Sequence, residues 1–308
     1  MIPISIKSVL ELTCFFNTRF VLLKGRNFGR YMPFSLEELQ DLGLVNVNYP
    51  ENLRKAVERA IASWKSFCYF PREEKKAFLF LEDNHGDGAG YELKEEKGSK
   101  KDLKENFHIT LYQYERLAAI ANQRTLPFLN DAKILLDAME PLILQFSEKV
   151  EKEFHVKGLA EEVKLSKPYW ILRYLHYFGD RQEGVEIASP HADKGGFTLH
   201  LYESDEGLQY FCITTRQWKA MPVYEKQTVI IPALQLQLRS EGNLKALYHR
   251  VVATKETART GRFSMVCFVT FQKTPMYNKN RYGNVQTHDT GFNYSIPQSE
   301  FAKLFLGV

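Results

Sequence analysis

The C-terminal half of the chain is a series of short strand-like runs separated by glycine, proline, asparagine and aspartate, and this pattern constrains the fold most. It begins near residue 165. The candidate strands are Tyr169–Tyr177, Ala188–Asp193, Phe197–Tyr202, Leu208–Ile213, Trp218–Val223, Thr228–Ile231, Leu234–Leu238, Tyr248–Ala253 and Arg262–Phe271. Short strands at this close spacing are typical of a sandwich or barrel, so we expect a β-barrel or jelly roll after residue 165.

Helical patterns dominate the chain before residue 165. Apolar residues there recur at helical spacing, and prolines and acidic residues mark helix starts. The predicted helices run from Pro50 to about Phe67, from Pro71 onward, from Asn130 to about Phe154, and over Pro297–Leu306 at the C-terminus. We therefore expect one compact unit, in which a helical and mixed region at residues 1–164 packs against a β-core at residues 165–308.

Composition and charge argue against several classes of protein. An apolar content of 44% and a charged content of 25% are those of a globular domain. The most apolar stretch, Leu10–Leu23, is interrupted by polar residues, so we expect no membrane span and no signal peptide. A net charge of +4 with both signs mixed argues against a nucleic-acid partner. Four widely separated cysteines favour a reducing cytoplasm over a disulfide framework.

The tripeptide His191-Ala192-Asp193 lies at the end of a candidate strand and is the leading metal-binding motif. Alternate residues of a strand share a face, so His191 and Asp193 can reach one ion. His249, on another candidate strand, offers a third ligand. Two imidazoles and one carboxylate form the facial triad of non-haem Fe(II) oxygenases, which leaves positions open for other ligands. A second His-x-Asp, His85–Asp87, lies in a glycine-rich loop and is predicted to be a turn.

The order of these residues resembles that of the Fe(II)/2-oxoglutarate-dependent oxygenase superfamily, in particular its isopenicillin N synthase-like branch. The resemblance covers roughly residues 40–275. The motifs that carry it are Pro190–Gly196, Gly207–Gln209, His249–Val252 and Arg262–Ser264, with looser matches at Leu44–Lys75, Gly90-Tyr91 and Asp102–Phe107. The resemblance implies a mainly β fold with helices, namely a double-stranded β-helix (jelly-roll) core buttressed by N-terminal helices.

Arg262 and Ser264 are alternate residues of one candidate strand, and a guanidinium with a hydroxyl is a good anchor for a carboxylate. The resemblance implies that they bind the far carboxylate of 2-oxoglutarate, with Tyr177 as a further contact. We expect Arg262 to face the barrel interior without a counter-ion from the chain, a costly state that a bound dianion would relieve.

Five other aromatic residues have expected places relative to the barrel. Phe107, His108 and Phe268 are expected to line the substrate pocket. His176 has the opposite parity from Tyr177 and is expected to point out of the barrel. His200 is expected to be structural.

The resemblance implies an enzyme, an Fe(II)/2-oxoglutarate-dependent dioxygenase that uses Fe(II), 2-oxoglutarate and O2 and releases succinate and CO2. Its expected substrate is a small molecule or a compound derived from an amino acid or peptide, with hydroxylation as the default reaction. One alternative is a 2-oxoglutarate-independent Fe(II) oxidase or cyclase of the isopenicillin N synthase type. A minor alternative is a non-enzymatic binding module on the same fold. We expect no nucleic-acid or membrane partner, and the oligomeric state stays open.

Overall fold

The computed structural model describes residues 36–82, 88–94, 103–222, 226–277 and 296–305. Residues Pro33–Val308 form one compact unit. The apolar stretch Leu10–Leu23 and the second His-x-Asp, His85–Asp87, lie outside the described residues. No helix in the described part of the chain is both long enough and apolar enough to cross a membrane.

Most of the described helices lie before residue 165 and most of the described strands after it, although strands also occur at residues 45–109. The helices are α1 (Glu37–Leu42), α2 (Glu51–Cys68), α3 (Arg72–Lys76), α4 (Leu111–Ala119), α5 (Leu126–Glu153), α6 (Leu159–Leu165), a 3₁₀ turn (Lys167–Tyr169), α7 (Leu234–Arg239), α8 (Lys255–Thr260) and α9 (Gln298–Lys303). The strands are β1 (Val45–Asn48), β2 (Leu81–Glu82), β3 (Gly88–Lys94), β4 (Lys104–Ile109), β5 (Ile171–Tyr177), β6 (Glu186–His191), β7 (Phe197–Glu203), β8 (Leu208–Cys212), β9 (Gln217–Ala220), β10 (Gln227–Pro232), β11 (His249–Val252) and β12 (Arg262–Val269).

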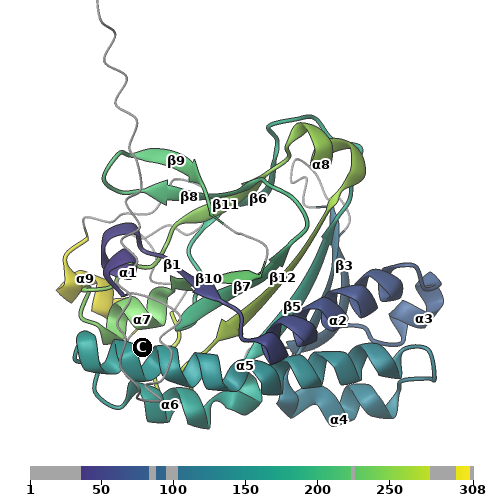
Figure 1. Cartoon of the computed structure of the whole chain (residues 1–308), viewed down its shortest axis with the longest axis horizontal. Coiled ribbons are helices and arrows are strands. Elements are labelled where there is room, and N and C mark those ends of the chain that lie inside the picture. The colour runs from purple at the N-terminus through teal and green to yellow at the C-terminus, as the bar shows by residue number, and fades with distance from the viewer. Residues whose placement is uncertain (1–35, 83–87, 95–102, 223–225, 278–295, 306–308) are drawn as a thin grey trace, which may run out of the picture. The chain divides into compact units, whose positions relative to one another are not determined.

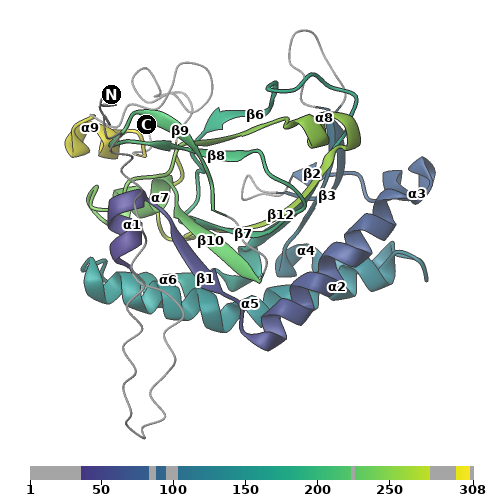
Figure 2. The same ribbon diagram turned by 45° about the horizontal axis from the view of Figure 1, so that its top comes forward.

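The strands form two antiparallel sheets that face each other, which is the predicted jelly roll (Figures 1 and 2). The large sheet has the order β1-β10-β7-β12-β5-β4-β3-β2, and the small sheet has the order β6-β11-β8-β9. Apolar side chains of both sheets meet in one cluster between them, among them Leu175, Val266 and Val229 of the large sheet and Ile187 and Val251 of the small sheet. The inner faces of the two sheets therefore enclose the barrel interior.

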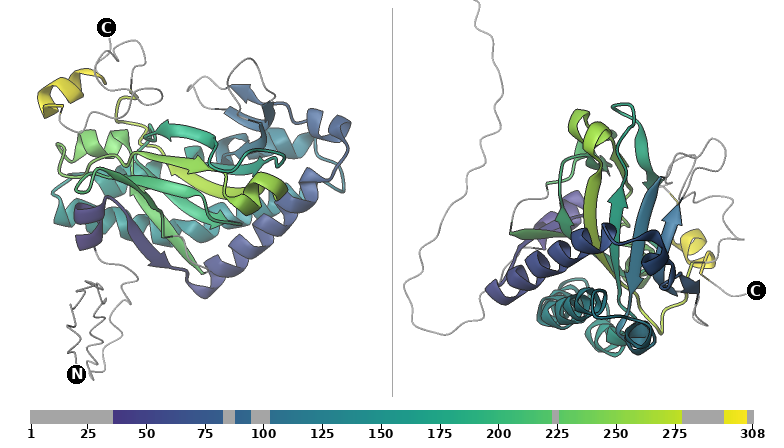
Figure 3. Two further views of the ribbon diagram at one scale, coloured as in Figure 1. Left: turned by 90° about the horizontal axis from the view of Figure 1, so that it is seen from above. Right: turned by 90° about the vertical axis from the view of Figure 1, so that its right-hand side faces the viewer.

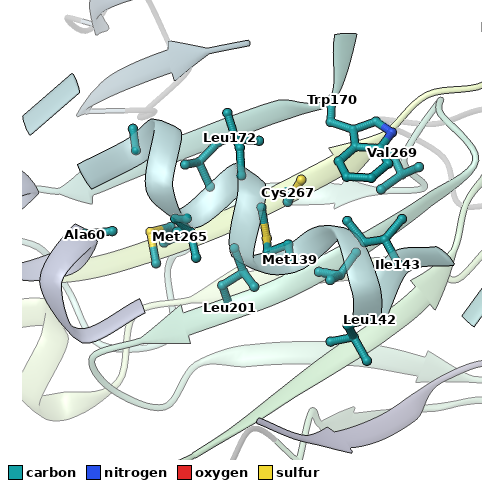
Figure 4. Packing of buried hydrophobic residues seen from close by; sticks show 14 of the residues in the cluster. Ala60, Met139, Leu142, Ile143, Trp170, Leu172, Leu201, Met265, Cys267 and Val269 are labelled. Atoms are coloured by element: carbon teal, nitrogen blue, oxygen red, sulfur yellow. The ribbon is translucent and has the colours of Figure 1, made fainter. Parts of the chain in front are cut away.

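A layer of helices covers the outer face of the large sheet (Figure 3). Trp64 of α2 is fully buried there, and its indole N–H donates to the carbonyl oxygen of Leu175 at 3.3 Å. Met139 and Ile143 of α5 pack in the same core as Met265 and other outward residues of the sheet (Figure 4). The predicted apolar stripe of α2 is confirmed, and burying each large side chain stabilises the layer by about 1.5–3 kcal/mol.

One predicted strand is wrong. The run Leu234–Leu238 forms helix α7, although leucine and glutamine alternate there with the period of a strand. The glutamines are buried and bind nearby backbone: the Gln235 amide donates to the carbonyl oxygens of Phe271 and Thr274 at 3.0 and 2.8 Å. Because polar and apolar residues are both buried here, their alternation does not mark one buried and one exposed face of a strand.

Candidate metal centre and carboxylate anchor

Strand pairing brings the three predicted ligands together. His191 ends β6 and is the direct partner of His249, the first residue of β11, while Asp193 lies just beyond the end of β6. The predicted strand Ala188–Asp193 thus ends two residues early, and Asp193 lies in the loop that follows β6. Gly196 allows the loop after Asp193 to pass close to Phe271, since a Cβ at that glycine would lie 2.1 Å from the ring. The loop between the strands is therefore held tightly where it presents Asp193.

The ligand atoms of the triad, which we call the inner cluster (His191, Asp193 and His249), converge on one point. His191 Nε2 lies 3.5 Å from Asp193 Oδ1, and His249 Nε2 lies 4.0 Å from Asp193 Oδ2. One ligand atom of each residue lies within 4.8 Å of those of the other two. Ligand atoms sit on the order of 2 Å from a first-row metal ion, so these separations suit three ligands on one ion.

Hydrogen bonds orient all three ligands. Nδ1 of His191 donates to the carbonyl oxygen of Ser189 at 2.8 Å, and Nδ1 of His249 donates to that of Leu247 at 3.1 Å. Because a carbonyl can only accept, these bonds place the proton of each neutral ring on Nδ1 and its lone pair on Nε2, which faces Asp193. The Thr198 hydroxyl donates to Asp193 Oδ2 at 2.6 Å and holds the carboxylate in place.

The charge states of the inner cluster suit metal binding. Burial alone would raise the pKa of Asp193, but the two histidines and the Thr198 hydroxyl outweigh it and hold that pKa well below its ordinary range. Burial, together with the neighbouring His191, lowers the pKa of His249 to about 4. At neutral pH the site therefore offers a carboxylate and a neutral His249 imidazole, the forms that coordinate metal.

Arg262, Ser264 and Tyr177 lie together on the inner face of the large sheet, as predicted. Arg262 and Ser264 are alternate residues of β12, and Tyr177 of β5 is the direct neighbour of Arg262. Arg262 is 1% exposed. We call Arg262 and Ser264 the carboxylate anchor.

The expectation that Arg262 lacks a counter-ion from the chain is wrong. Glu203, the last residue of β7, places its carboxylate Oε2 2.6 Å from Nη2 of Arg262. The Ser264 side chain also interacts with this carboxylate and helps to lower its pKa. His200, whose ring centroid lies 5.7 Å from that of His249, approaches Glu203 Oε1 with Nδ1 at 3.0 Å. A carboxylate of the chain itself therefore occupies the carboxylate anchor.

The three predicted pocket residues divide between the two faces of the sheet. Phe107 is wrong as a pocket residue, because it points outward and packs against Phe67 of α2 and Phe128 of α5, with ring centroids 5.3 and 4.9 Å apart. Neighbouring residues of a strand point to opposite faces, so Phe107 and His108 cannot both face the interior. Phe268 has the inward parity of Arg262, and it stays a predicted pocket residue, as does His108.

A second group of metal-type side chains, the outer cluster (Cys68, Glu105 and His176), lies on the outer face of the large sheet. As predicted, His176 points out of the barrel, and its Nδ1 lies 2.9 Å from Glu105 Oε1. The other carboxylate oxygen of Glu105 accepts hydrogen bonds from the Lys75 ammonium at 2.7 Å and the Tyr91 hydroxyl at 2.8 Å. The Lys75 ammonium therefore already neutralises the carboxylate that a metal ion would bind.

Comparison with known proteins agrees with the interpretation of the inner cluster as a metal centre. Residues 168–271, which contain the triad and the carboxylate anchor, match the sequence profile of the 2OG-Fe(II) oxygenase superfamily. This segment of the chain is similar to that superfamily. The isopenicillin N synthase-like branch is consistent with it. Members of the superfamily use Fe(II), 2-oxoglutarate and O2.

Individual relatives support the same assignment over part of the chain. Clavatol oxidase claD of Penicillium crustosum is 32% identical over 113 residues, covering 35% of this chain and 32% of the relative. A 2-oxoglutarate-dependent dioxygenase of Didymella fabae is 32% identical over 117 residues, covering 35% of this chain and 34% of the relative. The chain thus spans about a third of the length of these curated relatives.

Similarity of fold extends further than similarity of sequence. The crystal structure of a full-length Neurospora crassa protein in complex with alpha-KG and thymine has a TM-score of 0.67 and 17% identity. The match covers 88% of this chain and 87% of that one. It shows that the helices and both sheets share the jelly-roll arrangement of that structure.

Proposed function

We propose that the chain is an Fe(II)- and 2-oxoglutarate-dependent dioxygenase that oxidises a small-molecule substrate, by hydroxylation in the default case. One observation carries this proposal: two imidazole Nε2 atoms and one carboxylate converge between the sheets, with both Nδ1 atoms already bonded to backbone carbonyls. Two histidines and one carboxylate are the donor set of non-haem Fe(II) oxygenases. The cytoplasmic location suggested by the separated cysteines stays a prediction.

His191, Asp193 and His249 are the residues that would hold Fe(II). When bound, the metal with 2-oxoglutarate and O2 supplies the oxidising chemistry, and 2-oxoglutarate is converted to succinate and CO2. The chain supplies the negative charge of Asp193, held by Thr198, and two rings that their backbone bonds keep from rotating. Val266 and Val229, the register partners of His200, make the interior on that side of the site apolar.

The carboxylate anchor supports the 2-oxoglutarate part of the proposal. Arg262 and Ser264 already hold one carboxylate, that of Glu203, so their donors suit the far carboxylate of the co-substrate. The same contact favours the second candidate, a 2-oxoglutarate-independent Fe(II) oxidase. If Glu203 keeps the anchor permanently, the electrons must come from the substrate itself.

Binding of 2-oxoglutarate separates the two candidates. We expect the Fe(II)-loaded protein, kept free of oxygen, to develop the visible absorption band of an Fe(II)–keto acid chelate at millimolar 2-oxoglutarate. Arg262→Lys keeps the charge beside Glu203 but loses the planar fork, so it should weaken 2-oxoglutarate binding by less than about tenfold and leave metal binding intact. Wild-type protein that binds iron yet shows no band would rule out the dioxygenase and leave the oxidase as the leading candidate.

If the band appears, a substrate screen can identify the substrate and the reaction. O2 is then admitted together with each of a panel of small molecules. Succinate formation should rise above the slow background of uncoupled turnover only when the molecule is a true substrate. The mass change of the consumed compound then names the reaction, since hydroxylation adds one oxygen atom and desaturation removes two hydrogens.

A further inference from the structure

The carboxylate of Glu203 makes the contacts that the far end of 2-oxoglutarate would make. It lies against Nη2 of Arg262 at 2.6 Å and interacts with the Ser264 side chain. Nδ1 of His200 adds a third contact at 3.0 Å. Glu203 and Arg262 are 4% and 1% exposed, so water does not screen this contact. Glu203 therefore acts as a built-in occupant of the carboxylate anchor.

The occupant is ionised. Burial alone would raise the pKa of Glu203, but the Arg262 guanidinium and the bonds from His200 and Ser264 outweigh it and lower the pKa. One negative charge thus already balances the guanidinium. A second carboxylate that approaches Arg262 meets a neutral pair, and it also meets the like charge of Glu203 at short range.

The contact nevertheless leaves Arg262 with donors to spare. Although Nη2 of Arg262 and Oε2 of Glu203 are close, neither atom makes an aligned hydrogen bond to any described residue. The Nε–H of Arg262 donates to the carbonyl oxygen of Asp205 at 3.3 Å. The pair is therefore a charge contact rather than the two-pronged fork that makes guanidinium–carboxylate pairs strong. A ligand carboxylate can share or displace it.

We propose that Glu203 is a specificity-determining residue that competes with the distal carboxylate of the 2-oxo acid for Arg262 and Ser264, and so reduces the preference for 2-oxoglutarate over 2-oxo acids without a second carboxylate. This inference rests on the proposed function, because it concerns the co-substrate of that same site. The wild-type protein then selects its 2-oxo acid mainly through the metal-chelating end of the molecule.

Removing the charge of Glu203 tests the competition directly. Glu203→Gln keeps the length of the side chain and an acceptor for Ser264. The dissociation constant of 2-oxoglutarate should fall about tenfold or more, because its carboxylate then meets an unopposed guanidinium. The constant for 2-oxopentanoate, which has the same chelating end and no second carboxylate, should change less than about twofold. Both constants are measured without oxygen from the absorption band of the Fe(II) chelate.

A matched control separates this effect from general electrostatics. Glu92 of β3 is also a carboxylate on the large sheet, but it binds Asn106 and lies near Lys94 rather than at the carboxylate anchor. Glu92→Gln should leave both dissociation constants within about twofold of wild type. An equal gain in 2-oxoglutarate affinity for Glu92→Gln would overturn the proposal.

The wild-type protein provides a test that needs no variant. Its dissociation constants for 2-oxoglutarate and 2-oxopentanoate should differ by less than about tenfold. A preference of about a hundredfold or more for 2-oxoglutarate, or unchanged binding in Glu203→Gln with iron bound, contradicts the inference and leaves the proposed function standing. The absence of a chelate band for both acids in both proteins overturns the proposed function and this inference together.

Discussion

The inner and outer clusters contain similar side chains and differ in what already surrounds them. In the inner cluster the two histidines bond outward to backbone carbonyls, and their Nε2 atoms face Asp193 across 3.5 and 4.0 Å. In the outer cluster Glu105 binds a lysine, a tyrosine and a histidine, all within 2.9 Å. The inner cluster therefore directs its ring Nε2 atoms at the carboxylate, whereas the carboxylate of the outer cluster is already bound by an ammonium and a hydroxyl.

The same difference decides what each cluster contributes. The outer cluster is an internally satisfied ion pair between the sheet and the helices, and its effect is on stability. The inner cluster brings together ligand atoms of two histidines and one carboxylate, and we expect its effect to be on metal binding. Three substitutions, taken from the largest expected effect to the smallest, test this contrast.

Asp193→Ala should have the largest effect. It removes the only negative charge of the inner cluster and one of three ligands, so metal binding and any turnover should be lost. Titration with Fe(II) or Co(II) under anaerobic conditions measures the binding. The paired variants His85→Ala and Asp87→Ala should keep wild-type affinity, because that His-x-Asp lies in a glycine-rich stretch of sequence predicted to be a turn. Retained binding in Asp193→Ala would contradict the assignment.

Glu105→Gln should lower stability without changing metal binding. It breaks a buried pair with Lys75, in which the side chains are 3% and 11% exposed, and should reduce the free energy of unfolding by about 3 kcal/mol. Urea unfolding followed by circular dichroism measures the loss. Glu256→Gln, in an exposed pair with Arg259, is the control and should cost less than about 0.5 kcal/mol. Loss of metal from Glu105→Gln would mean that the outer cluster is also a metal site.

The stability effect of Glu105 depends on pH in a defined direction. Burial alone would raise its pKa, but bonds from His176, Lys75 and Tyr91 outweigh burial and lower the pKa to about 2. In the unfolded chain the pKa of glutamate is about 4.3. The stabilisation is therefore complete above about pH 4.3 and is lost as the pH falls toward about 2. The gap in stability between wild type and Glu105→Gln should narrow below pH 4.

The alternation of strand residues allowed much of the site to be predicted from the sequence. It placed Arg262 with Ser264 and pointed His176 outward, whereas Asp193 meets His191 from the loop beyond β6. The same rule excludes Phe107 from the pocket if His108 lines it, because adjacent residues of a strand face opposite sides of the sheet. The prediction of Phe107 as a pocket residue did not follow this rule.

Glu203 was missed because its position depends on the register between strands. In simple alternation His200 and Glu203, three residues apart, would face opposite sides of β7. The pairing of β7 with β12 shifts register between Met265 and Val266, which adds one residue to β7 at this point. This bulge brings both side chains to the inner face. A contact between two strands that depends on a bulge cannot be read from either strand alone.

Thr198→Val tests the smallest expected effect, the orientation of a ligand that remains in place. Thr198 is 1% exposed, and valine has nearly its shape but lacks the hydroxyl that donates to Asp193 at 2.6 Å. Asp193 then keeps its charge and loses one fixed donor, so metal affinity should fall about tenfold, as is usual for partners of metal ligands. Thr228→Val is the matched control, since it removes a buried hydroxyl that donates to the backbone of His200 at 2.8 Å and touches no ligand of the triad. If both variants lose metal affinity equally, the effect comes from loosening β7 in general. If only Thr198→Val loses metal affinity, the hydroxyl acts by orienting Asp193. Its hydrogen bond then holds the carboxylate in the position from which it binds metal.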